Sequence, residues 1–423
     1  MANIAAISQL TAEKGVEALI ADTDPMLKVI DKSYNATFSN GTFQSGQTIN
    51  IRVEDQPAEM VQQTAFNNDP IIQKELPVTA LNYTTGLEIG TAFEQFDIGG
   101  PTFLDDRVNK ARMRMAAVKA NQVAYAATVS KAPRFLSNYA AGTAIKTATD
   151  FGYVRAALTN MIASGGLYCA MQPDDMAQVA GDLAGKFNPT TDSSTAYLDG
   201  VVKMAAGLNM YESTLIPYHT NGSAVATGAA GMYLSANVTT GATSFTVAGG
   251  TANGIITAGS IVFFPGNGST TGANEVNPTT KQTLSNKAGF TVAETVQLSG
   301  SGVGTITVTQ AIYGPENNKL QNVSRLPTVD GTAAYVQIYG TASHTYRQMF
   351  AFKKETFAAF IGLKQAELIR NDNGIAYYDR VPVQTAANGD IMNRVNIMRL
   401  DLLAGATLTQ WRHCVRMFTA DVT

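Results

Sequence analysis

Acidic side chains are the first residues of this sequence that could do chemistry, because a pair of carboxylates can serve as general acid and general base in hydrolysis. The candidates for such a pair are Asp150, Asp174, Asp175 and Glu212. One hypothesis is therefore a hydrolase that uses these groups beside a carbohydrate-binding β domain. Paired carboxylates are common in proteins, so this hypothesis ranks third, behind two structural ones.

The other groups that could be nucleophiles or metal ligands lie far apart: His219, His344, His413, Cys169 and Cys414. A site with two of the histidines would need distant segments to meet, and the cysteines match no metal or redox spacing. Phosphate-loop, nucleophile-elbow and zinc-protease motifs are absent, and the glycine run at 300–304 precedes a strand pattern rather than a helix. We therefore expect structural histidines, reduced thiols, and no catalytic residue, cofactor or metal.

The composition favours contact with other proteins. The 423 residues are 45% hydrophobic and 15% charged, with a formal net charge of -3, whereas about 25% charged residues are usual. Such a balance argues against tight nonspecific binding to nucleic acid or to an anionic membrane. No window reaches about 18 apolar residues and no basic stretch opens the chain, so we expect a soluble protein that is not exported.

The elements before residue 130 include one long helix and one long polar segment. Short helices are expected at Gln9 to Ala21 and after Pro25, and strands between Asn40 and Asp97. Pro101 to Val129 has a helical apolar stripe and predicts a spine helix. The stretch from Glu54 to Glu75 predicts a long projecting loop or hairpin that contacts a partner. Its candidate subunit-interface residues are Arg52, Glu54, Asp55, Glu59, Lys74 and Glu75.

A mixed unit and a β-rich unit follow. Helices at Asp150 to Ala163 and Asp174 to Lys186 flank a buried strand, Leu167 to Met171, and a third helix is possible between Asp192 and Leu208. Only four charged residues lie between Gly222 and Ile312, where short apolar runs alternate with Gly, Asn and Pro. The mixed pattern returns after Ile338, with a turn at Asn371 to Gly374. These changes predict an all-β domain inserted into an α+β unit.

This order of elements resembles a phage coat protein, the group of major capsid proteins of short-tailed, double-stranded-DNA phages. Proteins of that group insert a β-rich domain into the capsid fold that tailed phages share with herpesviruses. The stretches that carry the likeness are Gln47 to Glu59 (QTINIRVEDQPAE), Met171 to Ala180 (MQPDDMAQVA), Tyr197 to Pro217 (YLDGVVKMAAGLNMYESTLIP), the Gly389-Asp390-Ile391 turn and Arg399 to Ala406 (RLDLLAGA).

The resemblance implies a non-enzymatic protein that forms an icosahedral shell of pentamers and hexamers, first as a procapsid and then as a mature head in the virion. It implies a scaffolding protein and a portal as partners, enclosed double-stranded DNA without sequence-specific binding, no membrane, and assembly in the host bacterial cytoplasm. The implied parts are an N-terminal arm (1–40), an extended loop and peripheral domain with the spine helix (41–148), the first part of an axial domain (149–221), an inserted β-rich domain (222–338) and a return segment (339–423).

The second hypothesis is another polymeric phage or surface protein, such as a tail-tube or adhesin subunit. It accounts for the β-rich composition rich in Gly and Thr, but it does not explain the long helix expected from Pro101 to Val129.

Overall fold

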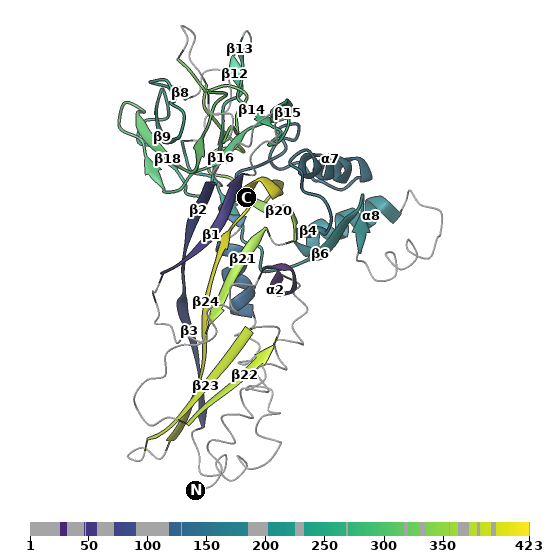
Figure 1. The fold of residues 1–423 in the computed structure, drawn as a ribbon, viewed down its shortest axis with the longest axis vertical. Coiled ribbons are helices and arrows are strands. Elements are labelled where there is room, and N and C mark those ends of the chain that lie inside the picture. The colour runs from purple at the N-terminus through teal and green to yellow at the C-terminus, as the bar shows by residue number, and fades with distance from the viewer. Residues whose placement is uncertain are drawn as a thin grey trace, which may run out of the picture. The chain divides into compact units, whose positions relative to one another are not determined.

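A computed structural model gives an α+β protein with many strands and few helices (Figure 1). The residues that it describes are 26–31, 46, 48–56, 72–89, 118–127, 129–184, 202–224, 232–267, 270–316, 320–329, 335–354, 356–362, 372–378, 381–390 and 395–422. The chain divides into two compact units, residues 1–52, 75–127 and 357–409, and residues 53–74, 128–356 and 410–423.

The first unit is built around one long strand. β24 (Val395–Leu408) pairs with β3 (Leu81–Ile89) along one side, and with β23 (Val381–Asp390) and then β21 (Phe357–Gly362) along the other. β22 (Asp372–Tyr378) extends the sheet beyond β23. All these pairs are antiparallel, so a single strand of 14 residues aligns segments that are distant in the sequence.

Two helical segments accompany this sheet. α2 (Met26–Val29) begins directly after Pro25, and the following Asp31 forms a bridge with Ala358 beside β21. Residues 118–127 are helical, and Lys119 lies 4.9 Å from the ring centre of Tyr83 in β3. These residues confirm the end of the expected spine helix, whereas 101–117 and the expected helix at 9–21 lie outside the described residues.

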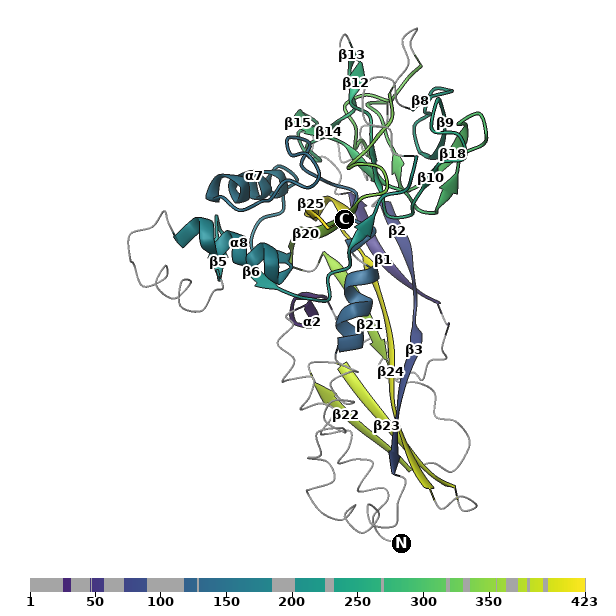
Figure 2. The same ribbon diagram turned by 180° about the vertical axis from the view of Figure 1, so that it is seen from behind.

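The second unit contains a six-stranded sheet in the order β25-β20-β4-β6-β5, with β7 paired to β20. Two helices, α7 (Ala148–Thr159) and α8 (Pro173–Ala184), lie beside this sheet (Figure 2). Its strands are β4 (Leu167–Met171), β5 (Met204–Ala205), β6 (Leu208–Glu212), β7 (His219–Thr220), β20 (Thr345–Lys353) and β25 (Cys414–Asp421). A 3-10 turn, η1 (Trp411–His413), precedes β25. The predicted helix, strand and helix around 150–186 are confirmed.

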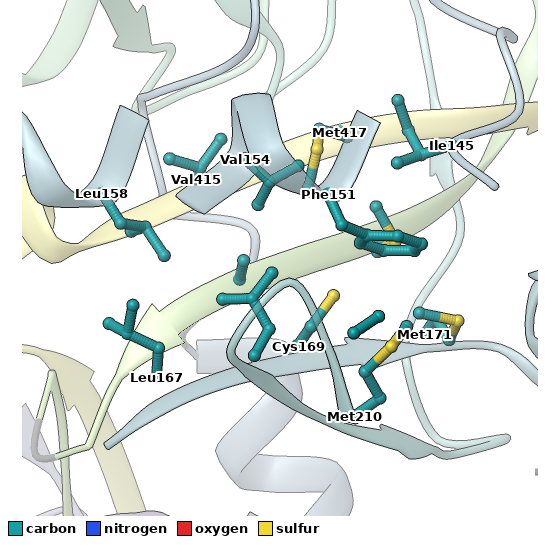
Figure 3. Packing of buried hydrophobic residues seen from close by; sticks show 14 of the residues in the cluster. Ile145, Phe151, Val154, Leu158, Leu167, Cys169, Met171, Met210, Val415 and Met417 are labelled. Atoms are coloured by element: carbon teal, nitrogen blue, oxygen red, sulfur yellow. The ribbon is translucent and has the colours of Figure 1, made fainter. Parts of the chain in front are cut away.

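Helix α7 covers this sheet through its apolar stripe. Phe151, Val154 and Leu158 are spaced at i, i+3 and i+7, are fully buried, and face the strands (Figure 3). Opposite them lie Cys169 of β4 and Met417 of β25. Full burial of each large apolar side chain stabilises the fold by about 1.5–3 kcal/mol, so this contact fixes α7 on the sheet.

Strands within 222–338 form small antiparallel sheets that gather together (Figure 1, teal to green). They are β8 (Tyr233–Leu234), β9 (Ala242–Ala248), β10 (Ile255–Ile256), β11 (Ile261–Phe263), β12 (Gly266–Asn267), β13 (Thr270–Thr271), β14 (Asn274–Val276), β15 (Thr283–Lys287), β16 (Gly289–Thr291), β17 (Val296–Gln297), β18 (Gly304–Ile312) and β19 (Gln337–Ile338). Their inward side chains form one buried apolar cluster, and no helix occurs in the described part of this segment. The expected all-β character is confirmed.

Two local predictions were wrong over the residues that the structure describes. The possible helix within 192–208 does not extend over 202–208, where Met204 and Ala205 pair with β6 through a tight turn and Ala206 and Gly207 have φ angles of 50° and 78°; residues 192–201 lie outside the described residues. A helix cannot continue through two successive left-handed residues. The turn expected at 371–374 is also wrong over 372–374, which begin β22 and pair with β23.

Candidate functional site: a charged hairpin and buried polar groups

Five of the six candidate interface residues, all but Glu59, lie on two strands, β1 (Thr48–Gln56) and β2 (Ile72–Thr79), which form a two-stranded sheet. Apolar side chains alternate with polar ones: Ile51 and Val78 are 1% and 2% exposed, whereas Asn50 and Arg52 are exposed. The base of the pair is anchored at Gly405 of β24, because a Cβ there would lie 2.6 Å from the Thr79 carbonyl oxygen. One face of this hairpin is therefore buried and the other is open.

Charges on the open face pair with each other within the chain. Arg52 Nε lies 3.1 Å from Glu75 Oε1, and Asn50 Nδ2 donates to Glu75 Oε2 at 3.3 Å. The Arg52 and Glu75 side chains are 73% and 51% exposed, so this ion pair contributes only about 0–1 kcal/mol. The structure thus brings two of the six candidates together and leaves both accessible.

The other four candidates are distributed along the same segment. Lys74 is exposed in β2 beside Glu75. Glu54 and Asp55 belong to β1, although their side chains are outside the described part, and Glu59 lies outside the described residues altogether. Both ends of the predicted segment are strands that pair with each other, which agrees with the hairpin alternative, whereas 57–71 lie outside the described residues.

The carboxylate of Asp150 caps the N-terminus of helix α7. It is the third residue of a capping box on α7, in which the Asp150 backbone N–H donates to Thr147 Oγ1 and the Thr147 N–H donates to Asp150 Oδ2. Tyr139 also donates its hydroxyl to Asp150 Oδ1 at 2.7 Å. Burial opposes ionisation, but these hydrogen bonds and one from Lys146 outweigh it and lower the pKa of Asp150. A carboxylate held ionised in this way stabilises α7.

Asp174 and Asp175 form an ion-pair network at the start of α8. Arg347 of β20 contacts Asp174 and lies 3.2 Å from Asp175 Oδ1, while Thr419 of β25 donates to Asp175 Oδ2 at 2.6 Å. Burial raises the pKa of Asp175, against the Thr419 hydrogen bond and the Arg347 charge. Glu212 ends β6 and is exposed. Asp174 and Asp175 therefore have structural partners that tie α8 to the sheet.

The three histidines have different environments. His219 is stacked on Phe418 at 5.3 Å, and its Nε2 lies within hydrogen-bond distance of Asn221 and Ser260. His413 is half-buried, and His344 pairs with Asp421 at the surface. The histidines do not converge on one site, which agrees with the structural role expected from their separation.

The two cysteines are free and buried. Cys169 pairs with Ala351 and Cys414 with Phe352, which are neighbours on β20. Adjacent residues of a strand point to opposite faces, so the two thiols lie on opposite sides of the sheet. Burial raises the pKa of Cys169 above its usual range and that of Cys414 to about 12. The separation of the two thiols agrees with the expectation that they do not pair with each other.

Sequence reasoning missed two buried arginines. Arg134 is 1% exposed and pairs with Glu275, and Arg416 is 0% exposed and donates to the carbonyl oxygens of Val129 and Gly259. A signal was present for each. Arg416 interrupts an apolar strand, and Glu275 is an isolated charge in a segment with very few, so each needed a buried partner.

The described residues offer no site for a metal: no group of three His, Cys, Asp or Glu side chains is close enough to hold one. Within the same residues, no helix is long and apolar enough to span a membrane.

A comparison of the sequence with models of protein families assigns the chain to one family. The family model described as "P22 coat protein - gene protein 5" matches residues 1–418. Comparison with curated protein sequences gives no match.

Among solved structures, the chain is similar to one from Mycobacterium phage Che8 (8% identity, TM-score 0.45, 92% of this chain and 89% of that one). It is also similar to the capsid of Ralstonia phage GP4 (7% identity, TM-score 0.44, covering 93% of this chain and 88% of that one). A third similar structure is the satellite phage P4 procapsid that includes the size determination protein (6% identity, TM-score 0.41, covering 97% of this chain and 90% of that one). At these TM-scores the structural likenesses carry no argument of their own.

The family match spans nearly the whole chain, and the groups suspected of catalysis have structural partners or lie apart. The chain belongs to the P22 coat protein family, and it is a structural, non-enzymatic major capsid protein that assembles in many copies into the icosahedral shell of phage virions.

Proposed function

We propose that the open face of the β1–β2 hairpin contacts a neighbouring subunit in the shell. The observation that carries this proposal is the alternation of burial along β1, which commits Ile49 and Ile51 to the subunit's own core and leaves Asn50 and Arg52 outside. Exposed ion pairs are individually weak, so specificity comes from their number across the lattice. The interface residues are Arg52, Glu54, Asp55, Glu59, Lys74 and Glu75.

Charge reversal tests the proposed contact between the hairpin and a neighbouring subunit. The variant E54K/D55K should remain folded, because both residues follow the anchored base of the hairpin, but it should assemble at least tenfold more slowly than the wild type. The matched control E294K/E316K reverses two exposed charges between 222 and 338. Circular dichroism measures folding, and light scattering with electron microscopy measures assembly. Equal impairment in both variants would mean that assembly responds to net charge, and the hairpin proposal would fail.

The division into an arm (1–40), a peripheral part (41–148), an axial part (149–221 and 339–423) and an inserted domain (222–338) is also part of our proposal. Its support is that the ends of the insertion meet. The Asn221 N–H donates to the His344 carbonyl oxygen at 3.0 Å, and Asn221 Nδ2 donates to the carbonyl oxygens of Tyr339 and Thr341. A domain whose ends are adjacent can be inserted without disturbing its host.

We further propose that the shell forms in the host bacterial cytoplasm with a scaffolding protein and a portal, and encloses double-stranded DNA without reading its sequence. The net charge of -3 supports the last point, because a wall without excess positive charge does not grip phosphates tightly. Regular shells of uniform size from the purified chain alone, seen by electron microscopy, would argue against the need for a scaffold.

A further inference from the structure

The guanidinium of Arg134 is buried where three parts of the second unit meet. Its Nε donates to Glu275 Oε1 at 2.6 Å and an Nη donates to Glu275 Oε2 at 2.8 Å, with side-chain exposures of 1% and 4%. Glu275 belongs to β14, within the β-rich segment 222–338. The other donors reach the carbonyl oxygens of Ala157 in α7, at 2.9 Å, and of Arg412 in η1, at 2.6 Å. One side chain therefore connects the β-rich segment, helix α7 and the turn before β25.

This contact constrains direction as well as distance. A guanidinium and a carboxylate that share two N–H···O bonds are held in one relative orientation, and the two carbonyl oxygens hold the same guanidinium from other sides. A lysine supplies the charge as a point with rotatable donors, so it does not impose this orientation. The Arg134–Glu275 pair therefore fixes how β14 is turned relative to α7 and η1.

A second polar contact joins the β14–β15 hairpin to the end of α7. Asn277 directly follows β14, and its Nδ2 donates to the carbonyl oxygen of Asn160, the C-cap residue of α7, at 2.8 Å. Its Oδ1 accepts from the N–H groups of residues 279 and 280, both at 3.0 Å, which orients the side-chain amide. A single contact would act as a pivot, whereas two contacts between one hairpin and one helix end resist rotation.

The β-rich segment and the six-stranded sheet have separate apolar clusters. Among the described residues, the cluster of the β-rich segment lies between 224 and 338, and the cluster under α7 lies outside this range. A smaller cluster contains residues from both parts: Phe135, Ile261, Tyr339, Tyr346 and Phe418. Apolar burial is non-directional. The directional contacts across this junction are therefore the polar ones.

Stability alone does not account for this ion pair. The transfer of two charges out of water is unfavourable, and apolar residues of similar volume often give equal or greater stability at such a position. Glu275 is nevertheless one of only four charged residues between Gly222 and Ile312. What the pair supplies, and apolar side chains do not, is a set of directional hydrogen bonds across the junction.

We propose that Arg134 and Glu275 are positioning residues for shell assembly, because their pair fixes the orientation of the β-rich segment on the six-stranded sheet. A closed symmetric shell repeats its subunit contacts many times, so subunits in which this orientation varies would join with errors. The inference is independent of the proposed role of the β1–β2 hairpin.

The variant R134K tests the orientation in the full-length, unassembled protein. Lysine keeps a positive charge for Glu275 but loses the two-pronged contact. Spin labels at T149C in α7 and T243C in β9 report the distance between the two parts by pulsed electron paramagnetic resonance, since both sites are exposed and the native cysteines are buried. The distance distribution of R134K should be about twofold wider than that of the labelled protein with Arg134.

The matched control is I306V, which removes one methyl group from the core of the β-rich segment and lowers stability without touching the junction. Its distance distribution should stay narrow. Under conditions in which the wild type assembles, electron microscopy should show at least threefold fewer regular closed shells for R134K than for I306V. An equally wide distribution in I306V, or normal shells from R134K, would overturn the proposal.

If R134K does not fold, as judged by circular dichroism, the milder variant N277A decides the question. It removes the second contact between the β14–β15 hairpin and α7 and leaves the buried ion pair in place. The distance distribution should widen, by less than in R134K, and the number of regular shells should fall in the same direction. Folded N277A with the distribution and shells of the wild type would refute the proposed positioning role.

Discussion

Two histidines, the buried His219 and the half-buried His413, should make the stability of this protein depend on pH. The pKa of His219 is lowered to about 3, first by burial and then by the nearby Arg416. The pKa of His413 is lowered to about 4, first by burial and then by Lys353 and Arg134. In an unfolded chain a histidine has a pKa of about 6.5, so both rings are neutral when folded and take up protons on unfolding as the pH falls.

Stability should therefore decline on acidification below about pH 6.5 and down to about pH 3, where His219 would also be protonated in the folded state. Each histidine contributes about 1.4 kcal/mol per pH unit, so the free energy of unfolding of the unassembled subunit should fall by about 2–3 kcal/mol between pH 7.5 and 5.5. The raised pKa of Asp175 acts in the opposite direction. Denaturant titrations of H219Q should show about half of the wild-type slope, and an unchanged slope would contradict this account.

Residue-scale prediction from the sequence succeeded where a residue type has one common role. The cysteines and histidines were expected to be structural, and the described contacts agree. The partners of Arg134 and Arg416 could not be found this way, because sequence patterns can indicate that a charge is buried but do not identify its partner. The partner of Arg134 is Glu275, 141 residues further along the chain.

At the scale of elements, α7 depends on its first turn. The Thr147 side chain accepts from the Asp150 N–H, and the Asp150 side chain accepts from the Thr147 N–H. The variant T147A should lower the free energy of unfolding by about 1 kcal/mol. The matched control T149A changes an exposed threonine in the same turn and should leave stability unchanged or slightly raised, because alanine favours helices. Urea denaturation of both variants measures the difference, and equal effects would rule out the cap.

Elements with a strong local pattern were predicted well, and those fixed by turns were not. The buried run Leu167–Met171 is β4, as expected. The failure at 204–208 has a physical cause, because the apolar residues there suit a helix while Gly207 permits the left-handed turn between β5 and β6. The sequence indicated the segment that contains the six candidate interface residues. It could not predict that two of them, Arg52 and Glu75, pair with each other.

At the scale of the whole molecule, the segment 222–338 should fold as an isolated fragment. It has its own buried apolar cluster, including Val247, Phe290 and Ile306. Circular dichroism should give a β spectrum, and amide NMR should give dispersed signals. Its charged residues balance to zero, so it should be poorly soluble. A disordered fragment would show that the boundaries are wrong.

The central position of β20 has a consequence for synthesis. This strand pairs with residues 167–171, 219–220 and 414–421, so its neighbours leave the ribosome at widely separated times. Contacts between distant segments form slowly, and chains fold from the N-terminal end as they emerge. The sheet cannot close until β25 has been translated. A nascent or prematurely terminated chain that lacks β25 therefore has an unpaired β20 edge and an incomplete sheet, and we expect such a chain not to join the shell.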